Sequence, residues 1–172
     1  MIDFQTLYER HADAVYRFAL YLSGDPMSAE DIVSETFIRV WDARERVELT
    51  TVRSYLLAIA RNVFLHGKRS ERRLLEMPES LPDPGPDVGE RIERESELNA
   101  ALAALQDLPE VDRAAVLLRA QEVPYAEIST MLGLPAVAVR VRVHRARTRL
   151  ARIVGSRSAQ GADEGVRKNA DH

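Results

Sequence analysis

Two short helical patterns joined by a tight turn lie between Pro124 and Ile153, and they constrain the fold more than any other stretch. The first pattern ends at Gly133, which can adopt the positive φ that a tight turn needs. The second begins after Pro135, because proline is favoured where a helix starts. Its apolar residues recur every three or four positions, as along one buried stripe: Val139, Val143, Ala146, Leu150 and Ile153. The stretch is a helix-turn-helix pattern.

The second helix of this pattern is strongly basic outside the apolar stripe. Six arginines lie within thirteen residues: Arg140, Arg142, Arg145, Arg147, Arg149 and Arg152. No Asp or Glu occurs between Glu127 and Asp163 to offset them. Guanidinium groups without opposing carboxylates suit phosphate oxygens, whereas a solvated surface normally mixes both signs. A basic surface helix or coiled-coil strand is the alternative, and the turn upstream favours a DNA-binding domain.

Charge is unevenly distributed along the 172 residues, although the net charge is only −3. Residues 1–73 contain 11 basic residues (Lys and Arg) and 11 acidic ones (Asp and Glu). Residues 74–98 contain 2 basic and 8 acidic residues, and residues 99–154 contain 8 basic and 5 acidic ones. Binding to DNA without a partner is therefore expected to be poor. The absence of cysteine excludes disulfides, thiolate metal sites and thiol nucleophiles. Without a long apolar run or signal-peptide features, a cytoplasmic location is expected.

Residues 1–73 predict three amphipathic helices. The first has apolar residues at helical spacing from Phe4 to Leu22. His11 lies on its apolar face and is interpreted as a partly buried core residue, because no metal-ligand partner shares that face. An approximate capping box, Ser28 followed by Asp31, starts the second helix; its inward positions are Ile32, Val33, Thr36, Phe37, Val40 and Trp41. The third helix follows a polar connection (43–51) and becomes basic toward its end: Arg61, Lys68, Arg69, Arg72 and Arg73.

Residues 74–97 contain four prolines, two glycines and eight acids, a composition that cannot bury enough apolar surface to fold. They are predicted to form a flexible acidic linker. Helical periodicity returns before the helix-turn-helix pattern, and residues 155–172 combine Gly, Ser and charge without an apolar period, which predicts a disordered tail. The predicted fold class is all-α, with small helical domains at 1–73 and 98–154.

These motifs, in this order, resemble the bacterial extracytoplasmic-function (ECF) sigma factors, the smallest class of sigma-70-like initiation factors. Residues 31–41, DIVSETFIRVW, look like the family's core-polymerase-binding helix, and residues 52–62, VRSYLLAIARN, look like its minus-ten-recognition helix. Residues 108–113 (LPEVDR), 125–129 (YAEIS) and 133–135 (GLP) together resemble the domain that reads the minus-thirty-five element. Each motif alone is weak, whereas the ordered set over residues 3–154 is specific.

The resemblance implies a non-enzymatic subunit, without cofactor or metal, that carries core RNA polymerase to promoter DNA and opens it. Three residues correspond to the polymerase-docking helix: Asp31, Glu35 and Arg39. Minus-ten contacts would come from Arg53, Arg61, Asn62, Lys68, Arg69, Arg72 and Arg73. Minus-thirty-five contacts would come from Val137, Ala138, Arg140, Val141, His144, Arg145 and Arg147. Family members are commonly held inactive by an anti-sigma factor, so this partner is expected, and membrane insertion is not.

Some positions depart from the family pattern. Gly, Thr and Ser are usual early in the recognition helix, where this chain has Val137, Ala138 and Val141. Both valines point away from the buried stripe on a helical wheel, so they are expected to be exposed. There they would contact either thymine methyl groups or a protein such as an inhibitor. Ala58 replaces a common basic residue, which leaves more of the DNA contact to Arg53, Arg61 and the basic end of that helix.

Two other classes of function fit the sequence less well. A stand-alone helix-turn-helix regulator that binds its operator as a dimer accounts for residues 109–153. It leaves the basic first domain and the acidic linker without a role, and no dimerisation helix or ligand pocket is evident. A hydrolase or transferase is disfavoured, because the chain has no Gly-rich phosphate loop, no His/Glu metal pair at ligand spacing and no nucleophile motif.

Overall fold

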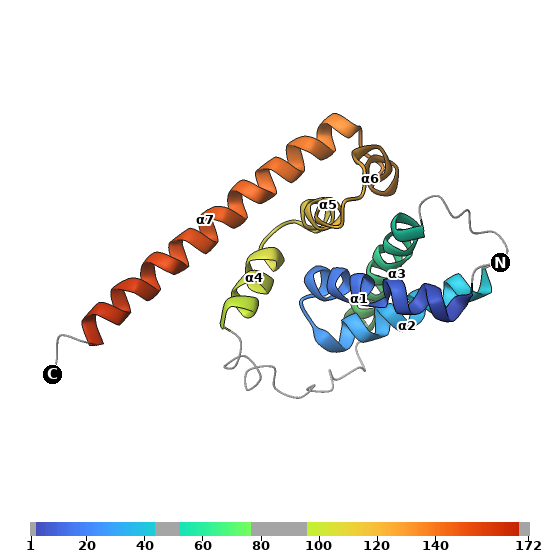
Figure 1. Cartoon of the computed structure of the whole chain (residues 1–172), viewed down its shortest axis with the longest axis horizontal. Helices are drawn as coiled ribbons and strands as arrows, with labels where there is room; N and C mark the ends of the chain where they lie inside the picture. Colours follow the sequence, from blue (N-terminus) through green and yellow to red (C-terminus); the bar gives the residue numbers. More distant parts are fainter. Residues whose placement is uncertain (1–2, 44–51, 77–95, 169–172) are drawn as a thin grey trace.

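The computed structural model describes residues 3–43, 52–76 and 96–168 of the chain, and these fold into seven helices without a strand. Three of them form an N-terminal bundle: α1 (Phe4–Ser23), α2 (Pro26–Asp42) and α3 (Val52–Glu76). The other four form a C-terminal bundle: α4 (Ser96–Gln106), α5 (Glu110–Ala120), α6 (Tyr125–Leu132) and α7 (Ala136–Lys168). Figure 1 shows the two bundles side by side, with α7 as the longest helix. The all-α prediction is confirmed.

The start of α2 differs from the prediction. Asp25, not Ser28, is the N-cap, and its carboxylate accepts hydrogen bonds from the backbone N–H (3.0 Å) and the hydroxyl (2.7 Å) of Ser28. Pro26 occupies the first helical position, where its missing N–H costs nothing. The capping box assigned to Ser28 and Asp31 is therefore wrong, because an Asp-Pro pair starts the helix one turn earlier.

The apolar face of each N-terminal helix packs into one core, as the periodicity predicts. Phe18, Leu22, Leu56 and Leu57 are almost fully buried there. Trp41 differs, because its side chain remains 47% exposed and packs edge-on against Phe4 with ring centroids 5.0 Å apart. It was expected inward, but it lies in the last turn of α2, beyond most of the core.

His11 is half-buried on the inner side of α1, as expected, and its Nδ1 has no hydrogen-bond partner within the described part of the chain. Burial lowers the pKa of His11 below its ordinary value, and the positive charges of Arg53 and Arg10 lower it further. Both effects favour the neutral form of the side chain, which suits a core position.

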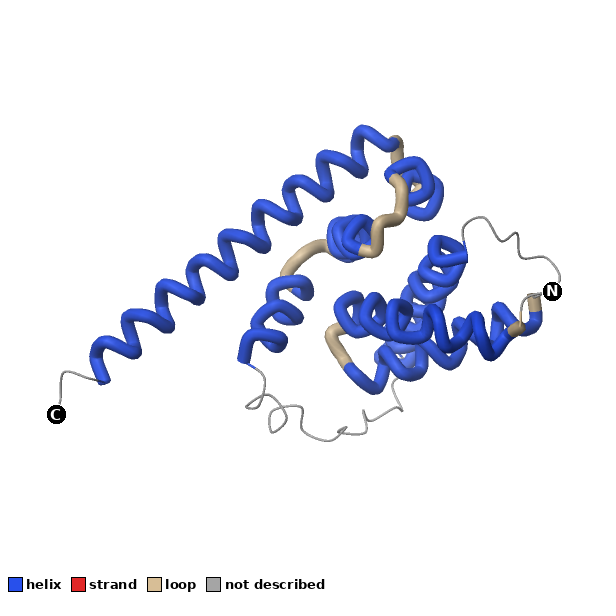
Figure 2. The backbone as a smooth tube through the Cα atoms, viewed as in Figure 1, coloured by secondary structure: helices blue, strands red, loops and turns tan. Residues whose placement is uncertain are grey.

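The helix-turn-helix prediction is confirmed in the C-terminal bundle. Gly133 ends α6 with a φ of 64°, and its backbone N–H donates to the carbonyl of Ser129. Val139, Val143 and Ala146 of α7 are buried against the helices before them. Figure 2 shows that the connections from α4 to α7 are short loops, so this domain is built almost entirely of helix.

The ends of the predicted linker and tail differ from expectation. Helix α3 continues to Glu76, and α7 continues to Lys168, so the structure has helix over residues 155–168, where the sequence predicts a disordered tail. No proline follows Pro135, and each further helical residue adds a backbone hydrogen bond without a new nucleation cost. Residues 77–95 of the linker, and 44–51 of the polar connection, lie outside the described residues.

The two bundles share a continuous hydrophobic core. Buried residues of α1 and α3 form one cluster with Ala114, Leu118 and Ile128 of the C-terminal bundle. Helix α1 lies against both α4 and α5. A flexible linker predicts two separate domains and gives no reason to expect this packing. The packing determines which site residues can face solvent.

Candidate promoter and polymerase interfaces

The predicted minus-thirty-five residues form an exposed face at the start of α7. Val137 is 73% exposed and Val141 is 42% exposed, as the helical wheel predicted. Arg140, His144 and Arg145 are exposed beside them. Residues three and four positions apart lie on the same side of a helix, so these side chains share one surface. Two further predicted residues flank it: Arg147 is exposed and Ala138 is half-buried.

The arginines of α7 are not equivalent. Arg142 donates to Asp112 of α5 at 2.6 Å and thereby ties the recognition helix to its support. The guanidinium of Arg140 lies 4.7 Å from the centre of the Tyr125 ring, and that of Arg119 lies at the same distance from it. Such cation–π contacts hold Arg140 in place while its donors stay available. The sequence had not indicated roles for Arg119 and Tyr125.

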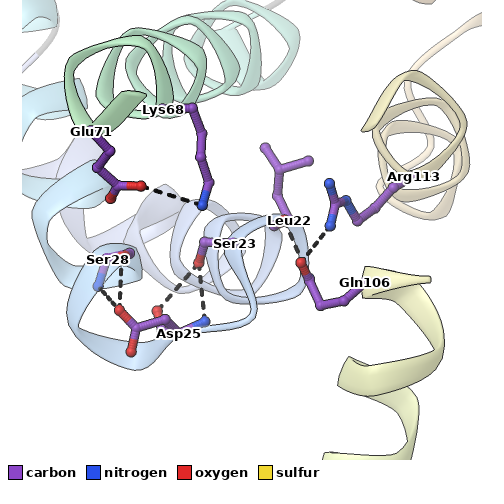
Figure 3. A network of polar contacts seen from close by, with 8 residues as sticks. All are labelled: Leu22, Ser23, Asp25, Ser28, Lys68, Glu71, Gln106 and Arg113. Atoms are coloured by element: carbon purple, nitrogen blue, oxygen red, sulfur yellow. Dashed lines mark hydrogen bonds and ion pairs between the residues drawn. The ribbon is translucent and has the colours of Figure 1, made fainter. Parts of the chain in front are cut away.

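The basic end of α3 projects from the N-terminal bundle. Asn62 and the side chains from His66 to Glu76 are exposed, including those of Arg69, Arg72 and Arg73. Lys68 pairs with Glu71 at 3.6 Å (Figure 3) and lies 5.8 Å from the Phe64 ring. These groups can follow a nucleic-acid backbone, because exposed cations keep their donors available for phosphate.

Arg61 of α3 is covered by the C-terminal bundle. Its Nε and Nη2 donate to the two carboxylate oxygens of Glu110, each at 3.0 Å, and its Nη1 donates to the Met131 carbonyl at 3.4 Å. Arg53 is exposed and reaches the Gln121 carbonyl at 3.5 Å. The predicted minus-ten residues are thus divided into an exposed basic end and a covered arginine.

The predicted polymerase-docking residues lie along one outer face of α2. Asp31 is exposed, and Glu35 forms an ion pair of 2.7 Å with Arg39. Asp31 and Glu35 also line a shallow pocket that α2 shares with Lys68 and Glu71 of α3. The structure therefore brings the docking residues close to the basic end of α3.

An apolar groove between α1 and α2 adjoins this face, and sequence reasoning missed it. Its wall includes three side chains that are roughly half exposed: Tyr8, Ile38 and Trp41. Because helical periodicity placed Trp41 in the core, nothing in the sequence pattern predicted this groove. Within the described residues, no three His, Asp or Glu side chains form a metal site, and no helix is long and apolar enough to cross a membrane.

Comparison with known proteins places both bundles in one family. Residues 7–74 match the model of sigma-70 region 2, and residues 98–150 match that of sigma-70 region 4. The ECF RNA polymerase sigma factor SigE of Mycolicibacterium smegmatis is 38% identical over 94% of this chain and 65% of its own length. SigL of Mycobacterium tuberculosis, another ECF sigma factor, is 32% identical over 83% of each chain.

A solved structure supports the same placement. The sigma factor RpoE of Bartonella quintana, in complex with the anti-sigma factor NepR, has a TM-score of 0.72 and 26% identity to this chain. The similarity covers 89% of this chain and 97% of that one, so it includes both bundles. With matching sequence models, relatives and fold over both domains, the chain belongs to the extracytoplasmic-function sigma factors of the sigma-70 family.

Proposed function

We propose that this chain binds core RNA polymerase, directs it to particular promoters and promotes their opening, acting in the cytoplasm as a non-catalytic initiation factor. One observation carries the proposal: residues 7–74 match sigma-70 region 2 and residues 98–150 match region 4, so both regions occur in order in one chain. This chain spans about 65% of the length of SigE, and only the roles of regions 2 and 4 are proposed for it.

The outer face of α2 is proposed to dock on the polymerase. Glu35 and Arg39 form an exposed i, i+4 pair, which contributes little to helix stability and can exchange partners at low cost. Asp31 adds a second carboxylate one turn earlier. Alternating charges of this kind set the orientation of a partner more than its raw affinity.

The minus-ten element is proposed to contact α3. Arg61 and Asn62 would hold an unstacked base through its polar edge, because bases are read most directly once they leave the stack. The neighbouring backbone would be held by Arg53 and by the basic end of α3: Lys68, Arg69, Arg72 and Arg73. Holding the unpaired strand favours the open state, since the protein binds that state better.

The minus-thirty-five element is proposed to contact the exposed start of α7, where helix-turn-helix proteins read base edges in the major groove. Val137 and Val141 offer methyl groups to thymine methyls, which replaces the hydroxyl contacts usual in the family. Ala138 and His144 lie beside them, and phosphate contacts come from Arg140, Arg145 and Arg147. The surrounding arginines favour DNA over an apolar protein partner for this face.

An anti-sigma factor is the proposed inhibitor. The solved relative RpoE was captured with the anti-sigma factor NepR, and its fold similarity to this chain covers both bundles. The apolar groove beside α2 adjoins the proposed polymerase face, so a protein bound there would block docking. The alternative, a stand-alone dimeric helix-turn-helix regulator, is not favoured by any feature of the N-terminal bundle, which matches region 2.

The test is promoter-dependent transcription in vitro. The full chain is added to bacterial core polymerase on a pool of genomic promoter fragments, and electrophoretic binding by the free chain is measured alongside. We expect defined transcripts that require both components and weak binding by the chain alone. Tight sequence-specific binding without core polymerase, together with no start-site selection in its presence, would support the dimeric regulator instead.

A further inference from the structure

An ion pair between the bundles covers a proposed DNA-binding group. All three guanidinium nitrogens of Arg61 donate to the C-terminal bundle: two to the carboxylate of Glu110 and one to the backbone carbonyl of Met131. The side chains of Arg61 and Glu110 are only 12% and 24% exposed. These contacts use three of the five N–H donors of the guanidinium and cover most of the side chain, so little of the group is left for a base or a phosphate.

A second carboxylate reaches the same helix. Glu127 accepts a hydrogen bond from the hydroxyl of Ser54, which is buried in α3. Glu110 and Glu127 occupy equivalent places, since each lies in the first turn of its helix after a proline N-cap that offers no side-chain bond. A negative charge is favourable at such a helix start. Two helix starts thus present carboxylates to one face of α3.

A third contact fixes the other end of the interface. Gln106, at the end of α4, donates to the carbonyl of Tyr21 at 3.1 Å. It also donates to the carbonyl of Leu22 (3.4 Å) and accepts from Arg113, as Figure 3 shows. Those two carbonyls belong to the last turn of α1, which leaves carbonyls without helical partners. Gly24 lies so close that an added Cβ would be 2.9 Å from the Gln106 side chain. The side chain of Gln106 therefore leaves no space for a larger residue at position 24.

We infer that the face of α3 around Arg61 is a receptor for carboxylates, and that Glu110 and Glu127 occupy it in competition with the minus-ten strand. The inference rests on the proposed function of Arg61. Carboxylates, phosphates and base edges all accept hydrogen bonds from a guanidinium, so they compete for Arg61, which the C-terminal bundle also covers. The chain therefore has a closed form that cannot hold the minus-ten strand, and it must open between the bundles before it does.

The size of the effect follows from the population of the open form. When only a fraction of a protein is competent to bind, its apparent affinity falls by that fraction. Weakening the carboxylate contacts raises the fraction of open molecules. Because the Arg61–Glu110 pair is partly buried, it stabilises the closed form more than a fully solvated ion pair would. We expect replacement of both carboxylates to raise the affinity for single-stranded DNA about fivefold or more.

The experiment uses the full chain, whose lack of cysteine permits clean labelling. Donor and acceptor dyes are attached to Met27→Cys in α2 and Ala151→Cys in α7, both exposed and outside the interface. Energy transfer reports closure, and fluorescence anisotropy reports binding of a random-sequence single-stranded DNA at low salt. The test variant is Glu110→Gln with Glu127→Gln. The matched control is Glu122→Gln with Asp107→Asn, which removes the same charge from exposed positions.

Two results together support the inference: lower energy transfer and higher DNA affinity in the test variant than in the control. In an Arg61→Ala background the same pair of replacements should give no further gain, because the contested donor is gone. Energy transfer equal to that of the control would overturn the closed form. Lower energy transfer with unchanged DNA affinity would overturn the competition. Core-dependent transcription by the unmodified chain tests the proposed function separately.

Discussion

Arg61 in the N-terminal bundle and Arg145 in the C-terminal bundle are both assigned to promoter DNA, yet their surroundings are opposite. Arg61 is 12% exposed and gives every guanidinium nitrogen to the other bundle, whereas Arg145 is exposed on α7. The difference lies in the carboxylates nearby. Glu110 and Glu127 face α3, while the sequence after Glu127 has no acid before Asp163. Arg61 is therefore covered, whereas the proposed minus-thirty-five face is exposed.

We therefore propose that the two surfaces act at different steps. A ready minus-thirty-five face can meet duplex DNA without rearrangement, as most pre-organised interfaces do. Under the inference above, Arg61 becomes available to the minus-ten strand only when a partner, such as core polymerase or separated DNA, shifts the population toward the open form. Replacing residues on the two surfaces should therefore change different steps of initiation.

The largest effect is expected from Arg61→Ala in the complex with core polymerase. Loss of a contact to an unstacked base costs about 1–3 kcal/mol, so open-complex formation should fall about tenfold or more. Permanganate reactivity of unpaired thymines measures opening, and electrophoretic mobility measures the closed complex. Arg17→Ala, an exposed arginine of α1, is the control. Equal opening by the two variants would remove Arg61 from the minus-ten site.

A second large effect is expected from Glu35→Lys. The substitution breaks the 2.7 Å pair with Arg39 and places two positive charges one turn apart on the docking face. Affinity for core polymerase should fall about tenfold, because charge reversal at an interface replaces attraction by repulsion. Glu30→Lys, also exposed on α2, is the control. Titration of labelled protein with core polymerase gives both values, and equal affinities would place docking elsewhere.

Periodicity predicted most of the fold because helix and core positions are local properties. The apolar stripe of α7, the turn at Gly133 and the exposure of Val137 all follow from spacing within a few residues. The pairing of Arg61 with Glu110 could not be predicted in this way, since the two residues are 49 positions apart and no local pattern links them. The helix over residues 155–168 was not predicted either. Once the packed first part of α7 has formed, each added residue extends the helix without a new nucleation cost, even though the segment contains three glycines.

A smaller effect should distinguish how the ready surface reads sequence. Deoxyuridine in place of thymidine removes one methyl group and keeps the hydrogen-bonding edge. If Val137 and Val141 contact that methyl, the substitution in the minus-thirty-five element should weaken closed-complex formation about fourfold. That factor corresponds to the free energy of burying about one carbon, about 0.8 kcal/mol. Promoter DNA with deoxyuridine in the spacer is the DNA control.

Protein variants complete this test. Val137→Ala with Val141→Ala should bind thymidine and deoxyuridine promoters nearly alike, because the contact is already lost. Val154→Ala, an exposed valine of α7 beyond the region 4 match, should keep the discrimination. If the wild-type complex does not discriminate, these valines face a protein partner instead.

The smallest effect compares two arginines of the same helix. Arg145 is exposed, whereas Arg142 is engaged with Asp112 at 2.6 Å. A cation that neutralises a phosphate releases counterions, so Arg145→Ala should lower the salt dependence of closed-complex formation by about 0.9 or less in logarithmic slope. Arg142→Ala should leave that slope nearly unchanged and instead lower the stability of the fold, because Asp112 loses its partner. Equal changes in slope would mean that Arg142 leaves Asp112 for DNA, and pairing in the free protein would then not decide which arginines bind a promoter. Such a result would also weaken the contrast with Arg61, whose carboxylate partner is proposed to keep it from DNA.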